Sequence, residues 1–176
     1  MRVLVLGGIR SGKSQWAETT ITGAAGAAEK VRYLATGARP AADTEWSARV
    51  DAHRSRRPTH WTTVETDDVA TQLRTDSMPT LVDDIGGWLT AVMDRRGAWT
   101  CGSVDDDVDD LLDAVERFDA ALALVSPEVG LTVVPATESG RRFADELGTL
   151  NQRLAELCDR VVLVVAGQPV TLKEPS

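Results

Sequence analysis

Short apolar runs alternate along the chain with longer segments in which apolar and polar residues recur at helical spacing. Several short runs are uninterrupted Val, Leu and Ala, as in strands that are buried on both faces. The pattern predicts strands at residues 2–6, 31–35, 61–64, 80–83, 121–125 and 160–166, with a last short strand at 170–173. Strands that alternate with helices are typical of a mostly parallel sheet covered by helices.

The intervening segments predict helices at residues 13–20, 45–55, 68–74, 87–94, 105–118 and 138–157. The last of them has apolar residues at a period of about 3.6, which is the α-helical repeat. The Gly- and Ala-rich residues 22–28 and the segment 38–44 are expected to be loops. With 176 residues and no internal repeat or linker, the chain is expected to form one α/β domain over residues 1–176.

Charge and composition argue against several classes of function. The net charge of -8 argues against a broad basic surface for nucleic acid, although it does not exclude a nucleotide. No run approaches the ~20 apolar residues of a membrane span, and the N-terminal apolar run is too short for a secretory leader. The two cysteines form no C-x-x-C pair, so a cytoplasmic protein is expected. Residues 105–110 hold five aspartates without EF-hand spacing, which predicts an acidic helix start rather than a calcium site.

A glycine-rich segment follows the first predicted strand. It reads Gly7-Gly8-Ile9-Arg10-Ser11-Gly12-Lys13-Ser14, which fits the phosphate-binding P-loop pattern G-x4-G-K-[ST]. Glycines let successive N–H groups point at an anion, and the following helix adds the positive end of its dipole. In this pattern Lys13 would reach the outer phosphates of a nucleotide, and the Ser14 hydroxyl would bind Mg²⁺.

A P-loop with Mg²⁺ usually also uses a carboxylate at the end of a neighbouring strand. The predicted strand at residues 80–83 ends in Asp83, followed by Asp84. We therefore predict Asp83 as the metal-associated acid, with Asp84 as the alternate; acids that merely begin a polar loop are the other interpretation. Asp83-x-x-Gly86 also matches a motif of regulatory GTPases, but no N-K-x-D guanine-reading motif follows.

A basic patch surrounds one of the chain's two histidines. Four of the sixteen arginines lie within a few residues of His53, which suggests an anion site in this acidic protein. A neutral imidazole can attack phosphorus, and arginines can neutralise charge on a transferring phosphate. The alternative is a solvated helix end, because arginines favour a helix C-terminus and Pro58 prevents continuation.

Seven motifs follow one another along the chain: the loop at 7–14, Tyr33-Leu34-Ala35-Thr36-Gly37, Arg49-Val50-x-x-His53 with Trp61-x3-Glu65, Glu128-Val129-Gly130 with Val134-Pro135, Arg141-x-Phe143-x-Asp145, Asn151-Gln152-x-Leu154-Ala155, and Val164-Val165-x-Gly167-x-Pro169. In this order they resemble the bifunctional adenosylcobinamide kinase/adenosylcobinamide-phosphate guanylyltransferase family of cobalamin biosynthesis. The resemblance implies a P-loop fold of the three-layer, RecA-like kind, with a sheet of six or seven strands. It also implies a homotrimer.

The resemblance implies two activities. ATP or GTP phosphorylates the hydroxyl of adenosylcobinamide, and GTP then transfers GMP to that phosphate through a histidine–GMP intermediate. His53 matches the guanylylated histidine. Beside Lys13 and the rest of the P-loop, the resemblance places nucleotide contacts at Ala35, Thr36, Gly37, Arg54, Ser55, Arg56, Arg57, Glu65 and Asp83.

The chain departs from the family pattern at three places. Pro127 stands where Asn is expected, residues 84–87 replace a segment that usually begins with Cys, and residues 136–140 lack expected polar groups. These departures concern the substrate side of the site. A monofunctional small-molecule kinase and a non-enzymatic nucleotide switch are the alternatives to the bifunctional enzyme.

Overall fold

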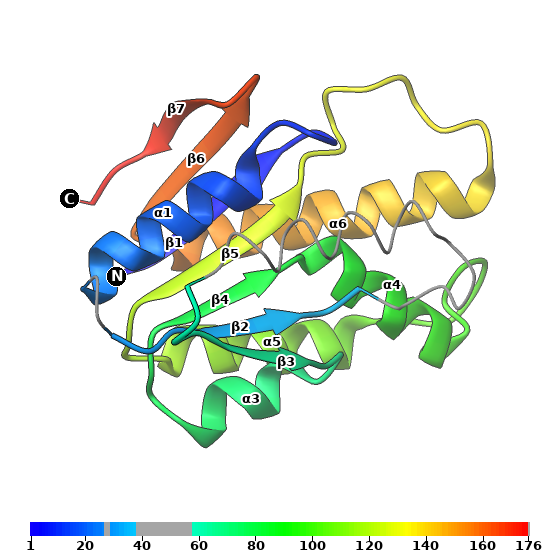
Figure 1. Ribbon diagram of the computed structural model, residues 1–176. Coiled ribbons are helices and arrows are strands. Elements are labelled where there is room, and N and C mark those ends of the chain that lie inside the picture. The colour runs from blue at the N-terminus through cyan, green and yellow to red at the C-terminus, as the bar shows by residue number, and fades with distance from the viewer. Residues whose placement is uncertain (27–28, 38–57, 176) are drawn as a thin grey trace.

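The computed structural model describes residues 1–26, 29–37 and 58–175. Their strands form one seven-stranded sheet in the order β3-β2-β4-β5-β1-β6-β7 (Figure 1). All neighbours pair in parallel except β7, which is antiparallel to β6. The strands are β1 (Arg2–Gly7), β2 (Arg32–Ala35), β3 (Thr62–Glu65), β4 (Thr80–Asp83), β5 (Leu122–Pro127), β6 (Arg160–Val165) and β7 (Gln168–Lys173).

Helices cover both faces of this sheet. One face carries α1 and the other carries α3 to α6, so the fold has three layers, as predicted (Figure 1). The helices are α1 (Lys13–Ala25), α3 (Val69–Thr75), α4 (Ile85–Arg96), α5 (Asp105–Arg117) and α6 (Glu138–Leu157). None of the helices formed by the described residues combines the length and apolarity needed to cross a lipid bilayer.

The uninterrupted apolar strands follow from this double coverage. In β1, Leu4 packs into the core beneath α3 to α6, whereas Val3 and Val5 pack into the core beneath α1. All three side chains are fully buried. Because side chains alternate across a strand, a strand with a core on both faces requires apolar residues at successive positions. The apolar runs therefore identified the central strands.

The first helix is longer than predicted. Residues 22–25, predicted as loop, continue α1 to Ala25, and Gly26 ends it at φ 98°. Ile21 is fully buried, and its packing anchors this last turn despite the poor helix propensity of the sequence. The predicted loop at 38–44 and the predicted helix at 45–55 lie outside the described residues.

Candidate functional site

The P-loop lies where the sequence predicts, between the end of β1 and the start of α1. Gly12 precedes α1 in the left-handed conformation at φ 93°, and Arg10 also has a positive φ of 56°. Glycine adopts such angles without steric cost, which explains Gly12. The Ser11 N–H donates to the Gly8 carbonyl at 3.3 Å and closes the turn. The result is a tight loop at a helix N-terminus, which is the backbone arrangement that binds anions.

The β6–β7 hairpin supports the loop from one side. The Gly167 N–H donates to the Ser11 carbonyl at 2.8 Å. A Cβ on Gly12 would lie 3.2 Å from the Gly167 Cα, so the two backbones touch. The Lys13 ammonium donates to the Gly8 carbonyl at 3.2 Å and thus lies over the loop. The hairpin thus holds the loop in place, and the Lys13 hydrogen bond holds the ammonium group over the loop.

The two acids predicted near the metal end β4 and begin α4. Asp83 accepts a hydrogen bond from the Tyr33 hydroxyl at 2.5 Å. Asp84 caps α4, and its carboxylate accepts from the Gly87 N–H at 2.6 Å. The buried Thr36 donates its backbone N–H to the Asp83 carbonyl and its hydroxyl to the Asp84 carbonyl. The Asp83 carboxylate is therefore held by a side chain of β2, whereas the Asp84 carboxylate is held by the backbone of α4.

Asp84 also shares an electrostatic environment with the P-loop. Burial raises the pKa of its carboxyl above the ordinary aspartate value, and the adjacent Asp83 charge raises it further. The Gly87 N–H and the Lys13 ammonium act in the opposite direction and lower this pKa. Lys13 and Asp84 thus influence each other across the strand that separates β4 from β1.

The other predicted nucleotide positions lie at the same edge of the sheet. Ala35 ends β2 and pairs with both Glu65 at the end of β3 and Asp83 at the end of β4. Thr36 and Gly37 follow Ala35 directly. The carboxyl edge of a parallel sheet is where α/β proteins bind ligands.

Strand β5 separates β4, which carries Asp83, from the P-loop strand β1, and both β4 and β5 separate β2 from β1. The structure therefore gathers residues 7–14, 35–37, 65 and 83 along one edge, although not around one point. His53, Arg54, Ser55, Arg56 and Arg57 lie outside the described residues.

A buried polar pair at the site was not predicted from the sequence. The Ser126 hydroxyl donates to the Asn151 side-chain oxygen at 2.6 Å, and the Asn151 amide donates to the Pro127 carbonyl at 3.0 Å. Pro127 pairs with Gly7, the first P-loop residue. Asn151 therefore positions the end of β5 beside the P-loop. The feature of the sequence that could have indicated this pair is the polar residue Asn151 on the apolar face of α6.

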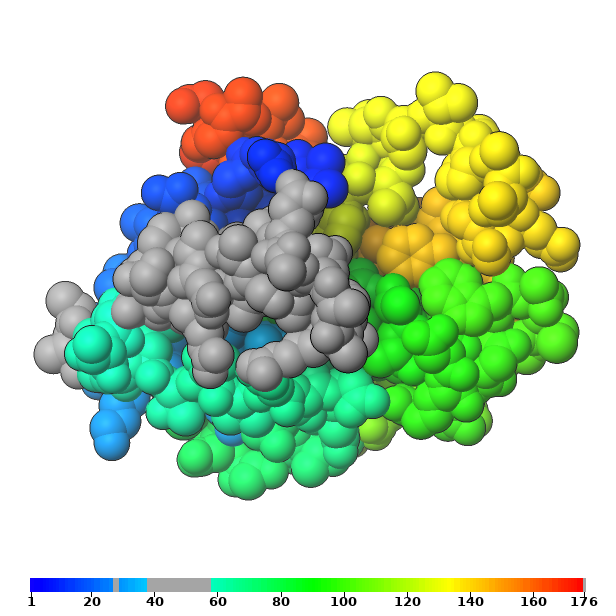
Figure 2. Space-filling view, turned by 45° about the vertical axis from the view of Figure 1, so that its right-hand side comes forward, coloured from blue at the N-terminus to red at the C-terminus, as the bar shows by residue number. Residues whose placement is uncertain are grey.

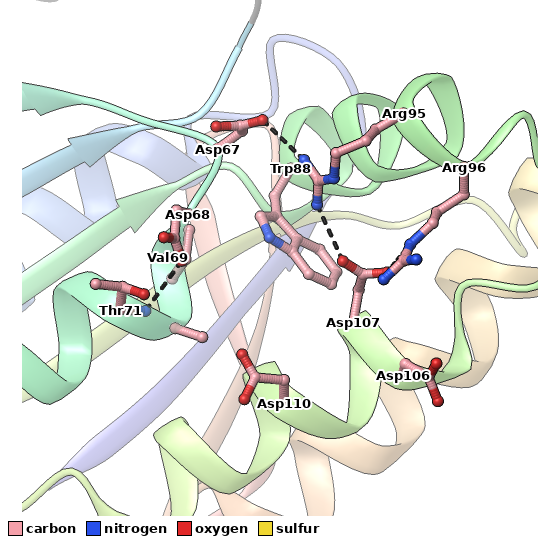
Figure 3. Close-up of a pocket in the computed structure, with 11 residues that line it drawn as sticks. Asp67, Asp68, Val69, Thr71, Trp88, Arg95, Arg96, Asp106, Asp107 and Asp110 are labelled. Atoms are coloured by element: carbon pink, nitrogen blue, oxygen red, sulfur yellow. Dashed lines mark hydrogen bonds and ion pairs between the residues drawn. The ribbon is translucent and has the colours of Figure 1, made fainter.

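A hollow of about 620 Å³ opens between α3, α4 and α5 (Figure 3). Both arginines that line it are paired with carboxylates: Arg95 bridges Asp67 at 2.9 Å and Asp107 at 3.0 Å, and Arg96 contacts Asp107 at 2.6 Å. Burial opposes the ionisation of Asp107, but the two arginines outweigh it and lower the pKa of this carboxyl. Neither the P-loop nor the acids after β4 line this hollow, so it is separate from the candidate site.

Solved structures support the fold. An ATPase from the type III secretion system of pathogenic bacteria aligns with 97% of this chain and 56% of its own, at 12% identity and a TM-score of 0.59. The flagellar accessory protein FlaH from Methanocaldococcus jannaschii aligns with 98% of this chain and 78% of its own, at 11% identity and a TM-score of 0.50. At such identities the likeness concerns the fold alone.

Sequence comparison is more specific. The bifunctional adenosylcobalamin biosynthesis protein CobP of Pseudomonas aeruginosa is 41% identical over 180 residues, covering 98% of each chain. The bifunctional adenosylcobalamin biosynthesis protein CobU of Salmonella typhimurium is 36% identical over 194 residues, covering 98% of this chain and all of its own. The family model for cobinamide kinase / cobinamide phosphate guanyltransferase matches residues 3–172. These matches show that the chain, with its P-loop and the acids at the same sheet edge, belongs to the cobinamide kinase / cobinamide phosphate guanyltransferase family.

Proposed function

We propose that this protein is a bifunctional transferase of adenosylcobalamin biosynthesis. It phosphorylates adenosylcobinamide with ATP or GTP and then transfers GMP from GTP to the resulting phosphate. One observation carries the proposal: a P-loop and Asp83 lie at the same carboxyl edge of the sheet, in a chain that aligns over 98% of its length with proteins named for this pathway. The same proposal describes a cytoplasmic, single-domain protein that assembles as a homotrimer.

In the kinase step the P-loop holds the triphosphate. The substrate hydroxyl oxygen attacks the γ-phosphorus and releases its proton to solvent, the bond from that phosphorus to the bridging oxygen breaks, and the nucleoside diphosphate leaves. Lys13 stabilises the charge that develops on the transferring phosphate. The N–H groups of the loop and the N-terminus of α1 hold the remaining phosphate oxygens.

Ser14 and Asp83 would hold Mg²⁺ in this step. Ser14 is the second residue of α1 and Asp83 ends β4, so both present oxygen donors at the carboxyl edge, and oxygen donors are what Mg²⁺ prefers. When bound, the ion neutralises charge on the phosphates. Tyr33 donates to one Asp83 oxygen and thereby orients the carboxylate.

In the guanylyltransferase step His53 is the nucleophile. An imidazole nitrogen attacks the α-phosphorus of GTP, a phosphorus–nitrogen bond forms, and pyrophosphate leaves. The phosphate of adenosylcobinamide phosphate then attacks the same phosphorus and releases His53. The arginine-rich neighbours Arg54, Arg56 and Arg57 supply positive charge for the phosphates. Ala35, Thr36, Gly37, Ser55 and Glu65 complete the proposed nucleotide contacts.

Product analysis tests the overall function. The purified protein is incubated with adenosylcobinamide, GTP and Mg²⁺, and the corrinoid products are identified by mass. We expect adenosylcobinamide phosphate first and adenosylcobinamide-GDP second. The phosphate alone identifies a monofunctional kinase, and no turnover by a protein that binds nucleotide identifies a switch; both outcomes contradict the proposal.

Labelling tests the covalent step. GTP labelled at the α-phosphate is expected to give acid-labile, alkali-stable label on the protein, and His53→Ala should remove it. His60 is the chain's other histidine, so His60→Asn is the matched control and should retain the label. Labelling that survives His53→Ala, or is lost equally in both variants, would sink the assignment of the nucleophile.

A further inference from the structure

The loop after β5 exposes apolar side chains beside the P-loop. Leu131, Val133 and Val134 are 79%, 88% and 72% exposed. Ile9, at the tip of the P-loop, is 85% exposed. We call these four side chains the apolar rim. Contact between apolar side chains and water is unfavourable, and a bound partner that covers them removes it. Grouped exposed apolar residues therefore commonly mark binding surfaces.

The loop is connected directly to the phosphate-binding site. The Glu128 N–H donates to the Gly7 carbonyl at 3.1 Å, so the loop departs from the first residue of the P-loop. In both the ribbon and the space-filling view, the loop rises next to the P-loop at the carboxyl edge of the sheet (Figure 1 and Figure 2). A group bound on the apolar rim would therefore lie close to the nucleotide phosphates.

The loop is also held in place at both ends. The Glu128 carboxylate accepts from the Gly130 N–H at 2.8 Å and from the Leu131 N–H at 2.9 Å. At the other end, the Arg141 guanidinium donates to the carbonyls of Pro135 and Ala136 at 3.0 and 2.8 Å. These hydrogen bonds fix the loop while its apolar side chains point into solvent. A preformed surface of this kind costs little ordering entropy when a ligand binds.

The opposite flank of the P-loop has a different character. Among the described residues there, the carboxyl edge presents Gly37, Glu65 and the acids after β4, which are small or polar. Within the part of the chain that the structure describes, the most exposed large apolar side chains near the phosphate site belong to the apolar rim, whereas Val165 at the end of β6 is 54% exposed. The apolar rim thus suits an apolar group of a reactant, and the opposite flank suits a polar one.

From this asymmetry we infer that the apolar rim is the binding surface for the corrin macrocycle of the acceptor substrate. The inference rests on the proposed function. A corrin ring is edged with methyl groups and carboxamides, and its reacting hydroxyl lies on a short side chain. The macrocycle must therefore bind close to the γ-phosphate, and the apolar rim is the adjacent apolar surface.

The loop backbone fits the polar part of the same ligand. In the described structure, residues 132–134 make no backbone hydrogen bonds, so their N–H and C=O groups are available to carboxamides. Apolar side chains with a few convergent backbone groups are the usual composition of a small-molecule site. A second copy of the chain would be the other occupant of such a surface, and the experiment separates the two.

The test variant is Leu131→Ser/Val133→Ser/Val134→Ser. Its matched control is Val170→Ser/Leu172→Ser on β7, which removes exposed apolar side chains on a strand that runs away from the P-loop. Binding of adenosylcobinamide is measured by equilibrium dialysis with its visible absorption, GTP affinity by calorimetry, and molar mass by light scattering. The single variant Val133→Ser repeats the measurements with a minimal change.

We expect the triple variant to weaken adenosylcobinamide binding about tenfold or more, because several apolar contacts are lost. GTP affinity should stay within about twofold of wild type, and the molar mass should not change. The β7 control should match the wild type in all three measurements. Unchanged adenosylcobinamide affinity in the triple variant would overturn the assignment. A lower molar mass would overturn it too, because the apolar rim would then be a contact between copies.

The wild type separates this inference from the proposed function. If the wild type neither binds nor phosphorylates adenosylcobinamide, the proposed function fails and the corrin assignment fails with it. If the wild type does both while the triple variant is unimpaired, only the assignment to the apolar rim fails.

Discussion

Gly86 has no room for a side chain, and the residue that excludes one is Pro127. A Cβ at Gly86 would lie 2.8 Å from the Pro127 Cγ, 3.0 Å from its Cδ, and 3.3 Å from a carboxylate oxygen of Asp84. The proline ring is rigid and belongs to β5, so it cannot turn aside. Gly86→Ala must therefore shift α4 against β5, next to the acids after β4 and the strand end that pairs with Gly7.

The expected cost follows from two opposing effects. Forcing one extra methyl group into a packed site costs about 1–3 kcal/mol. Alanine in place of glycine in a helix recovers up to about 1 kcal/mol, and less in the first turn. We therefore expect Gly86→Ala to lower the free energy of unfolding by about 1–2 kcal/mol, or the Tm by several degrees. In a Pro127→Ala background the two closest atoms are gone, so the same substitution should be neutral or stabilising.

The assay is urea unfolding of the wild type, both single variants and the double variant, followed by far-UV circular dichroism. The control is Gly148→Ala in α6, where the added Cβ has no atom within 4 Å apart from those of its own helix backbone and chain neighbours. It should stabilise the protein by about 0.5–1 kcal/mol. The reasoning is refuted if Gly86→Ala stabilises the wild type as the control does, or costs the same in both backgrounds. A coupling of about 1–3 kcal/mol between the two sites is expected.

Two further substitutions test the electrostatics and the buried polar pair. Asp84→Asn keeps a good helix cap but removes a carboxyl whose folded pKa is raised, mainly by burial. A raised carboxyl pKa means that wild-type stability falls as the pH rises from the ordinary aspartate pKa through the folded value. Urea unfolding across that range should show a weaker fall in the variant, and parallel curves would contradict the assignment. Asn151→Ala leaves the Ser126 hydroxyl and the Pro127 carbonyl unpaired and should cost about 1–3 kcal/mol. Unfolding unchanged from wild type would show that water replaces the amide.

The sheet and its phosphate loop could be predicted because strong local patterns specify them. Doubly buried strands need apolar residues at successive positions, and the P-loop needs glycine and lysine at fixed spacing. Both signals are visible in β1 and in the eight residues from Gly7. Even the acidic start of α5 follows from the preference of carboxylates for a helix N-terminus, and Asp105, Asp106 and Asp107 occupy its first turn.

Contacts between distant segments could not be predicted in the same way. Nothing local to Asn151 identifies Ser126 and Pro127 as its partners, because the contact depends on how α6 packs against β5. The steric pairing of Gly86 with Pro127 is of the same kind, although both positions stood out as departures from the family pattern. The extension of α1 to Ala25 depends on the burial of Ile21, which outweighs the weak propensity of the residues around it.

We propose that one phosphate-binding loop serves both reactions, because the sequence contains a single G-x4-G-K-[ST] motif. The most direct measurement is a time course of adenosylcobinamide phosphate and adenosylcobinamide-GDP formation by Lys13→Ala, compared with the wild type. Loss of a charge-stabilising donor predicts that both rates fall about 100-fold or more while the protein remains folded. A near-normal rate of either reaction in this variant would contradict the claim.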